Sequence, residues 1–419
     1  MSSADKIVSL GGEPAISATT KHPSWPVIDA DYEAAVNKQL HESISIYNRS
    51  GIIEEFENAF AEIHGRKYAL LNNSGTNSIW AMFVGAGLQP GDEVLCPTYT
   101  FFATNTPLLS SGLVPVFCDA DENGNINPED IEHRINSKTK AVIITHMWGY
   151  PCDMDRIVEI AKKHNLLLFE DCSHAHLAEY KNKRVGSFGD AAAWSLQGQK
   201  NITGGEGGIL LTNDQDIYIR ANLLGHYNKR CKDEIPVTHP LYRFAVTGMG
   251  LKMRSHPLAV AFADTQLKKH QNYQRMRDRC AKDYDELLAK YPFIERIPHA
   301  DTKPSWYAYV FKYVQPKTSK ITRQKLVALL HEEGLIEVDI PGSTGPNHLL
   351  PIFQEPSVLF PHFYTAGKQF NVDESFQGAN TFYSTVVKLP TWTQAEHDVL
   401  IKGYVKGLKK VLDHVQSSC

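Results

Sequence analysis

Short apolar runs alternate with amphipathic segments between residues 66 and 225. In 153–164, Met154, Ile157 and Ile160 recur at helical spacing, and a second helical stretch runs from Ser74 to Gly85. Continuous apolar strands that alternate with helices indicate an α/β fold, in which a mostly parallel sheet is covered on both faces. The apolar runs predicted as strands are 67–71, 94–96, 114–117, 141–144 and 166–169. Ligands bind at the carboxyl ends of such strands, so we expect the chemistry there.

The pattern changes after about residue 255. A long amphipathic helix is predicted over 259–287, and a last helix over 394–415. The segments 307–314, 323–333 and 336–340 lie between them and predict a smaller α+β domain. Residues 1–50 are rich in Ser and Pro and are predicted to form an N-terminal arm with short helices. The predicted division is therefore an arm at 1–50, a large α/β domain at 51–270 and a small C-terminal α+β domain at 271–419.

Composition narrows the classes of partner. The 419 residues include 43 basic and 47 acidic side chains, and this near-balance argues against a nucleic-acid binder that relies on phosphate neutralisation. Seven scattered cysteines without a CxxC pair argue against a disulfide framework or a structural zinc site. The chain opens without a signal-peptide pattern, and its longest uncharged stretch, 94–118, contains three prolines. We therefore expect a soluble cytoplasmic protein with no membrane span.

Two polar motifs follow predicted strands. Ser74-Gly75-Thr76 opens a helix, and the N–H groups of a helix N-terminus bind phosphate well. The same residues would also be found at an ordinary serine N-cap before a tight glycine turn. Asp171 ends the 166–169 strand, where its carboxylate suits either a protonated pyridine nitrogen or the capping of a neighbouring loop.

The residues that follow Asp171 include potential metal ligands. Cys172, His174 and His176 alternate and would share one face of an extended segment. No fourth ligand is suggested nearby, so the sequence predicts no metal.

Lys200 stands between an apolar strand and a cluster of four glycines at 204–208. Partial burial would lower the pKa of its amine and prepare it for Schiff-base formation, whereas a solvated loop lysine is the ordinary alternative. The cluster does not match a phosphate-binding Walker A loop. Phe101 follows another strand end, where it would stack on a planar cofactor or fill the core.

These motifs occur in a recognisable order. The succession of SGT, TF, EDxxH and SxxxxKxxxxGEGG resembles the sugar and cyclitol aminotransferases of the DegT/StrS family, which are fold-type I transferases dependent on pyridoxal 5'-phosphate (PLP). The resemblance implies that Lys200 forms the Schiff base and shuttles protons. It implies further that Asp171 pairs with the pyridine nitrogen. The cofactor's phosphate would be held by Gly75, Thr76 and Ser195, and Phe101 would stack on its ring.

Two positions depart from the family pattern. His174 stands where most members have Gln, beside the cofactor ring. Lys252 stands where the family's G-x-N-x-R motif places an Asn that reaches the phosphate in the neighbouring subunit. A cation there would also suit a phosphate. The resemblance thus implies a homodimer whose subunits share active sites.

The implied reaction is a ping-pong transfer from glutamine or glutamate to a keto-cyclitol or keto-sugar. The stretch 197–200 looks like the scyllo-inosose aminotransferases. Polar residues of 226–230, His226 and Tyr227 among them, and His348 are expected to line the acceptor site unless they form solvated loops. The alternatives are a nucleotide-keto-sugar aminotransferase, a PLP-dependent lyase that eliminates from an amino acid, and a non-catalytic PLP-binding protein. Relatives with His in place of the lysine are dehydratases, and Lys200 argues against that branch.

Overall fold

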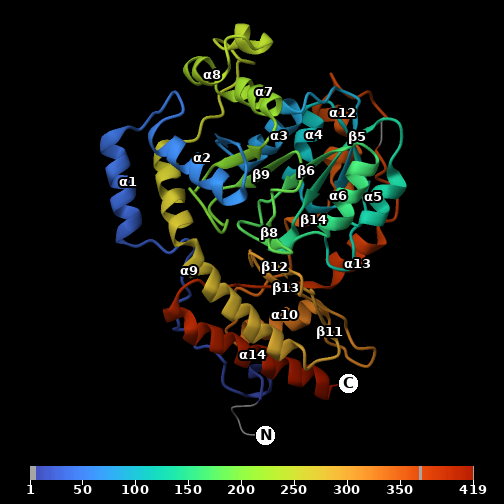
Figure 1. Cartoon of the computed structure of the whole chain (residues 1–419). Coiled ribbons are helices and arrows are strands. Elements are labelled where there is room, and N and C mark those ends of the chain that lie inside the picture. Colours follow the sequence, from blue (N-terminus) through green and yellow to red (C-terminus); the bar gives the residue numbers. More distant parts are fainter. Residues whose placement is uncertain (1–5, 368–369, 419) are drawn as a thin grey trace.

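A seven-stranded sheet forms the centre of the large part of the protein (Figure 1). The computed structural model describes residues 6–367 and 370–418. All neighbouring strands are parallel except at β10, which is antiparallel to both of its neighbours, so the predicted mostly parallel α/β sheet is confirmed. In spatial order the strands are β1 (Tyr68–Asn72), β10 (Gly208–Thr212), β9 (Ala191–Ser195), β6 (Leu167–Asp171), β5 (Thr139–Thr145), β2 (Glu93–Pro97) and β4 (Val114–Cys118).

The strands are continuously apolar because helices cover both faces of the sheet. Successive side chains of a strand point to opposite faces. In β1, Leu70 joins a core with Ile79 of α3 (Gly75–Gly85), whereas Leu71 joins another with Phe56 of α2 (Gly51–His64). The helices of the large part are α2 (Gly51–His64), α3 (Gly75–Gly85), α4 (Thr106–Ser110), α5 (Pro128–Arg134), α6 (Met154–Lys163), α7 (Gln215–Gly225) and α8 (Lys229–Glu234). The predicted helices at 74–85 and 153–164 correspond to α3 and α6.

The small part is built on a three-stranded antiparallel sheet of β11 (Ile294–Arg296), β13 (Tyr309–Tyr313) and β15 (Val386–Leu389). It also holds α10 (Arg323–Glu332) and α14 (Asp398–Ser417). The long helix α9 (Pro257–Leu288) confirms the helix predicted over 259–287 and runs from beside the large sheet into the small part (Figure 1). The division predicted at residue 270 therefore falls inside a continuous helix.

One segment of the predicted small domain returns to the large part. β14 (Thr344–Pro346) pairs with β3 (Tyr99–Phe101), and Tyr364 Oη donates to the carbonyl of Leu113 at 2.6 Å. The strand β12 (Thr302–Lys303) likewise pairs with β7 (Glu179–Tyr180), which pairs with β8 (Lys183–Arg184). The remaining helices here are α11 (Pro351–Gln354), α12 (Pro356–Leu359) and α13 (Gln377–Thr385). Through these pairings the small part contacts the large part.

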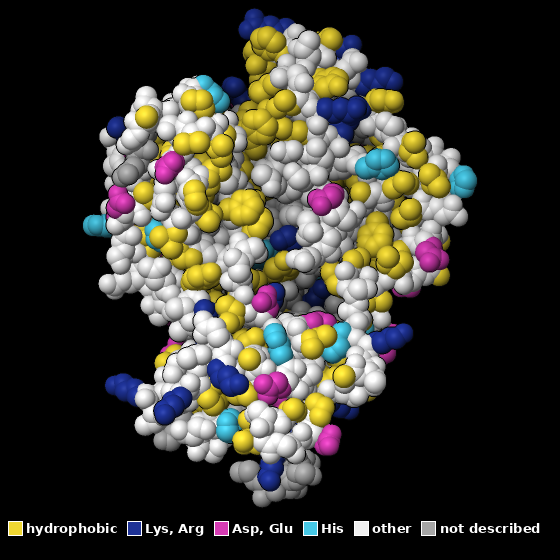
Figure 2. All heavy atoms as spheres, turned by 180° about the vertical axis from the view of Figure 1, so that it is seen from behind, with side chains coloured by type: hydrophobic (Ala, Val, Ile, Leu, Met, Phe, Trp, Pro, Cys, Tyr) yellow, Lys and Arg dark blue, Asp and Glu magenta, His cyan; other side chains and the backbone are white. Residues whose placement is uncertain are grey.

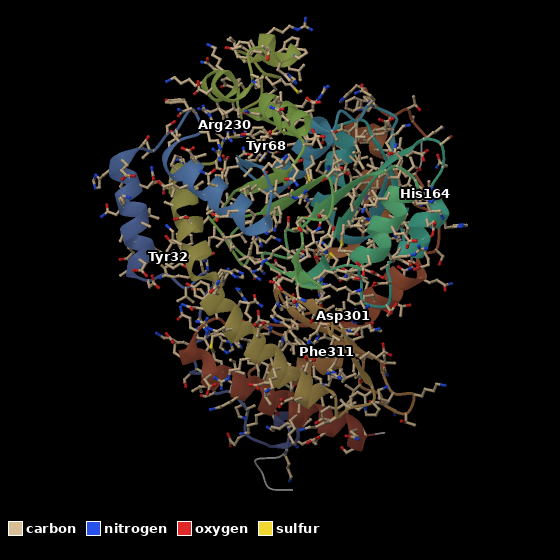
Figure 3. All side chains as sticks on the ribbon, viewed as in Figure 1. Tyr32, Tyr68, His164, Arg230, Asp301 and Phe311 are labelled. Carbon is tan, nitrogen blue, oxygen red and sulfur yellow. The ribbon has the colours of Figure 1, made fainter. Side chains whose placement is uncertain are left out.

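The N-terminal arm packs along both parts of the protein. Helix α1 (Ala30–Glu42) lies along α9, where Tyr32 Oη and Tyr273 Oη are 2.8 Å apart (Figure 3). Earlier in the arm, the carboxylate of Glu333 accepts from the N–H groups of Val8 and Ala15 at 2.9 and 3.0 Å. The arm therefore contacts both parts of the protein.

No helix within the described ranges is both long enough and apolar enough to cross a membrane.

Candidate active site

The carboxyl ends of β1, β9 and β6 meet at one edge of the sheet, beside a cavity of about 1060 Å³. Figure 2 shows this face hollowed between the large part above and the small part below, with basic side chains visible inside. The pairing of β1, β10 and β9 aligns Asn72, Gly208 and Ser195 across this edge. The predicted site residues that line the cavity are Gly75, Thr76, Phe101, Asp171, His174, Ser195 and Lys200.

The N-terminus of α3 forms one wall of the cavity. Ser74 Oγ accepts from the N–H of Asn77 at 3.1 Å, so Ser74 is the N-cap. The chain passes Ser195 so closely that a Cβ on Gly75 would lie 2.6 Å from Ser195 Cβ. The first N–H groups of a helix lack partners within it and attract anions. The N-cap and a phosphate site are therefore compatible at the same turn.

The glycine cluster after Lys200 has a packing role. A side chain on Gly208 would collide with the Ser74 carbonyl, and a Cβ on Gly204 would lie 2.5 Å from the Ala259 carbonyl oxygen. Gly205 and Gly207 adopt φ values of 85° and 144°, which side chains disfavour. The cluster thus lets β10 approach the helix turn that forms the cavity wall.

The carboxylate of Asp171 is buried and held in one orientation. Its Oδ2 accepts from Thr104 Oγ1 at 2.7 Å, and its Oδ1 accepts from the N–H of Ser173 at 3.0 Å. Thr104 in turn contacts the hydroxyls of Thr100 and Thr145 at 3.0 and 3.1 Å. The sequence did not single out Thr104, which reaches Asp171 from a separate loop. The carboxylate therefore presents a fixed negative charge to the cavity.

Lys200 is only 8% exposed, so the solvated-lysine interpretation is wrong. Burial lowers the pKa of its amine to about 8, against the opposing effect of the Asp171 charge. Its Nζ lies 4.7 Å from the centre of the Tyr307 ring, and its backbone carbonyl accepts from Trp25 Nε1 at 2.9 Å. About a tenth of this amine is therefore neutral, and hence nucleophilic, at pH 7, far more than for a lysine with an ordinary pKa.

His174 forms part of an aromatic wall. Its ring stacks on Tyr307, with centroids 4.1 Å apart and planes at 12°, and lies 5.6 Å from Trp148. Burial and the nearby Lys200 hold the pKa of His174 well below its usual range, so the imidazole is neutral. Its Nδ1 is buried and has no hydrogen-bond partner among the described residues. Tyr307 and Trp148 lie far from His174 in sequence and carried no local signal.

Four predicted residues lie outside the lining of this cavity. His226 is buried and contacts Asn72 Oδ1 at 3.2 Å, and Lys252 is exposed and pairs with His226 through the backbone. His348 Nδ1 contacts Thr98 Oγ1 at 2.6 Å. Tyr227 is half-buried beside His226. Their roles toward substrate or partner subunit stay predictions.

Arg230 is not an acceptor-lining residue. Both of its terminal nitrogens donate to the buried carboxylate of Glu57 at 2.9 Å, where α8 meets the body of the protein (Figure 3). The expectation that the basic run 226–230 lines the acceptor site is wrong for this residue, because tertiary contacts satisfy its charge.

The described residues do not bring Cys172, His174 and His176 together as a ligand group. The grouping that does form is His146, Glu170 and Cys172, with candidate ligand atoms within 4.8 Å of one another. Burial raises the pKa of the Cys172 thiol well above its usual range, which disfavours the thiolate that binds metals. The Glu170 carboxylate holds a loop instead, because it accepts from the N–H groups of Gly186, Phe188 and Gly189 at 2.6–2.8 Å.

A buried lysine and a fixed aspartate line one cavity at the strand ends of this α/β sheet, as in the fold-type I transferases that the sequence motifs resemble. The chain belongs to the DegT/DnrJ/EryC1/StrS aminotransferase family, whose model matches residues 26–401. It is an aminotransferase.

The names of the relatives refer to different sugars and cyclitols. The spore coat polysaccharide biosynthesis protein SpsC of Bacillus subtilis is 31% identical over 83% of this chain and 86% of its own. GDP-perosamine synthase of Escherichia coli O157:H7 is 32% identical over 79% and 86%. The L-glutamine:2-deoxy-scyllo-inosose aminotransferase of Streptomyces fradiae is 33% identical over 65% and 66%.

A solved structure, the aminotransferase from Psychrobacter cryohalolentis, is similar over nearly the whole length. It matches with a TM-score of 0.83 at 26% identity, covering 94% of this chain and all of the other.

Proposed function

We propose that the chain is a PLP-dependent aminotransferase that moves an amino group from glutamine or glutamate to a keto-cyclitol or keto-sugar. Lys200 carries the cofactor as a Schiff base. The observation that carries this proposal is the buried amine of Lys200, with its pKa lowered to about 8, in the same cavity as the oriented Asp171 carboxylate.

The residues present fit PLP at four points. The turn at Gly75 and Thr76, closed against Ser195, suits the phosphate, because unpaired N–H groups and hydroxyls converge there. The Asp171 carboxylate, held by Thr104, suits a protonated pyridine nitrogen. The buried and unpartnered Nδ1 of His174 suits a polar substituent of the ring. Phe101 lines the same cavity and suits a stacking contact with the ring.

Bound PLP supplies an electron sink for the carbanion formed at the amino-bearing carbon. Asp171 strengthens that sink by keeping a negative charge where a cationic ring nitrogen would lie. Lys200, once its amine is free, takes a proton from the substrate carbon and returns it, since a pKa near 8 permits both steps near neutral pH. The neutral His174 donates or accepts a hydrogen bond without adding a second cation.

The acceptor is proposed as a keto group on a polyhydroxylated ring. Relatives named for a nucleotide sugar and for an inosose both support this coarser class. The cavity, at about 1060 Å³, has room for a substrate beside the cofactor. Lys252 lies exposed and outside this cavity, which suits the role proposed for it in the site of a partner subunit.

The visible spectrum of the purified protein with PLP tests the proposal. Addition of L-glutamine or L-glutamate is expected to bleach the absorption band of the Lys200-bound cofactor, and a keto-cyclitol or keto-sugar restores it. Release of ammonia or pyruvate without any acceptor would instead identify an elimination enzyme. A band that forms but responds to no amino donor would favour the non-catalytic binding protein.

A further inference from the structure

Arg277, on α9, lines the same cavity as Lys200. Its side chain is buried, with the residue only 3% exposed. Nε and Nη1 are fully buried and have no hydrogen-bond partner among the described residues. Burial lowers the pKa of this guanidinium to about 10, which still leaves it positively charged at neutral pH. The described part of the chain therefore holds a cation without a hydrogen-bonded counterion at the wall of its cavity.

The adjacent acidic residue, Asp278, raises the pKa of Arg277 through its charge but accepts no hydrogen bond from the guanidinium. Asp278 Oδ1 accepts from Trp306 Nε1 at 2.7 Å and from Gln274 Nε2 at 2.8 Å. Buried charges in proteins are ordinarily paired, because removal from water is costly without a counterion. A buried and unpaired cation beside a cavity is accounted for if a ligand brings the missing anion.

Aromatic contacts hold Arg277 in place and leave its donors free. Arg277 Cζ lies 5.0 Å from the centre of the Trp25 ring, and Trp25 lies edge-on to Tyr273 at 5.7 Å. A cation–π contact uses the flat face of a guanidinium, whereas its N–H donors point outward in the plane. Trp25 also donates to the carbonyl of Lys200, so a single indole connects the guanidinium to the segment that carries the amine.

Two other basic side chains of the cavity wall already have partners. Lys388 Nζ donates to Asp339 Oδ2 at 3.0 Å, and His331 Nε2 contacts the carbonyl of Val338 at 2.8 Å. Among the described residues that line the cavity, Arg277 is thus the cation, besides Lys200, that has no hydrogen-bonding partner.

We propose that Arg277 binds the α-carboxylate of the amino donor and so sets the donor class as α-amino acids. This inference rests on the proposed aminotransferase function. A guanidinium fits a carboxylate with two parallel hydrogen bonds. One guanidinium matches one carboxylate in charge, whereas the diphosphate of a nucleotide sugar would need further unpaired cations. Every α-amino acid brings this carboxylate one bond from the carbon that carries its amine.

The test compares donors with and without the carboxylate in the PLP-loaded enzyme. In the wild-type enzyme, L-glutamate is expected to bleach the absorption band of the cofactor far faster than 4-aminobutyrate does. 4-Aminobutyrate is the same molecule as glutamate without the α-carboxylate. Arg277→Met is expected to raise the KM for L-glutamate by about 10- to 100-fold and to remove most of this preference. Arg277→Lys keeps the charge and loses the planar donors, and its KM for L-glutamate is expected to lie between those of wild type and Arg277→Met. The exposed Arg275 of the same helix provides the control, Arg275→Met, which is expected to behave as wild type.

Thermal unfolding gives a second readout that does not depend on turnover. Glutarate, a dicarboxylate without an amine, is expected to raise the melting temperature of wild type and not that of Arg277→Met. Without ligand, Arg277→Met is expected to melt at the same temperature as wild type or higher, because it removes a buried charge that lacks a hydrogen-bonded counterion among the described residues. A purely structural arginine would give the opposite, a lower melting temperature and an unchanged donor preference.

The outcomes separate this inference from the proposed function. If no amino donor bleaches the absorption band of the wild-type enzyme, the proposed function fails. Stabilisation by glutarate then still decides whether Arg277 binds a carboxylate. If wild type transaminates and Arg277→Met keeps its preference for L-glutamate over 4-aminobutyrate, the inference is overturned. It is also overturned if the variant raises only the KM of a nucleotide keto-sugar, since Arg277 would then belong to the acceptor's phosphates.

Discussion

A Cβ atom built on Gly75 would lie 2.6 Å from the Cβ of Ser195, so the first turn of α3 and the end of β9 are in contact only because residue 75 is glycine. The two residues are far apart in sequence and lie side by side at the edge of the sheet. The N–H groups of the helix and the hydroxyl of Ser195 therefore converge on the same point. We expect this contact to shape the phosphate end of the cofactor site.

Gly75→Ala is therefore expected to weaken PLP binding by at least about 10-fold, because the added methyl must push β9 and α3 apart. Titration of the apoenzyme with PLP, followed by absorbance, measures the change. Gly198→Ala is the matched control, since a Cβ there meets no atom closer than 3.8 Å. Equal affinities of the two variants would contradict the assigned phosphate site.

Asp171→Asn removes the charge and keeps the shape of the side chain. We expect kcat for transamination to fall by about 100-fold or more, because a cationic ring nitrogen would lose its buried counterion. Thr104→Val removes only one hydrogen bond to this carboxylate and is expected to cost about 10-fold or less. Steady-state rates at saturating donor distinguish the two, and a normal rate for Asp171→Asn would refute its role.

The lowered pKa of Lys200 predicts a pH dependence. The amine is protonated below about pH 8 and neutral above it, so the rate of PLP capture by the apoenzyme is expected to rise with pH and level off above 8. Asp171 opposes this shift, and Asp171→Asn should therefore move the midpoint to lower pH. Stopped-flow absorbance measures both profiles. Lys200→Ala is expected to abolish the band and the transamination, and turnover in that variant would refute the assignment.

Arg230 provides a contrast to Arg277, because both arginines are buried and only Arg230 is paired with a carboxylate. Arg230→Met would break a buried ion pair and leave Glu57 with only the partly exposed Arg49 as a charged partner in the described part of the chain, at a cost of about 3 kcal/mol of unfolding free energy. Urea denaturation of the two Met variants measures this, and we expect only the Arg230 variant to be clearly destabilised. Equal losses would mean that Arg277 is also structural.

The segment that follows α8 exposes apolar side chains, among them Val246 at 56% and Met249 at 50% exposure. Figure 2 shows hydrophobic side chains along the projecting top of the molecule. We expect this surface to lie in the proposed homodimer, so that the double substitution Val246→Asp and Met249→Asp yields monomers. Light scattering measures the mass. Val399→Asp, at an exposed site on α14, is the control, and an unchanged dimer in the double variant would place the interface elsewhere.

Most of the secondary structure and part of the site were predictable because their signals are local. The apolar runs of β1, β5 and β6 and the spacing in α6 follow from periodicities within a few residues. Asp171 was found because a polar residue at the end of a buried strand is a short-range signal, and Lys200 because it lies between such a strand and a glycine cluster. The parallel sheet then brings all such ends to one edge, so predicting the strands also predicted the neighbourhood of these residues.

Only the tertiary structure decided which distant side chains complete the site and which polar residues are structural. Trp25, Arg277 and Tyr307 reach the cavity from the N-terminal arm, α9 and the small part, and nothing near them in sequence distinguishes them. Conversely, Arg230 looked like a ligand-binding residue in the sequence, but the carboxylate of Glu57 pairs with it. Whether a charge is free for a ligand depends on the partners that folding brings to it, and those partners come from segments that local patterns do not relate.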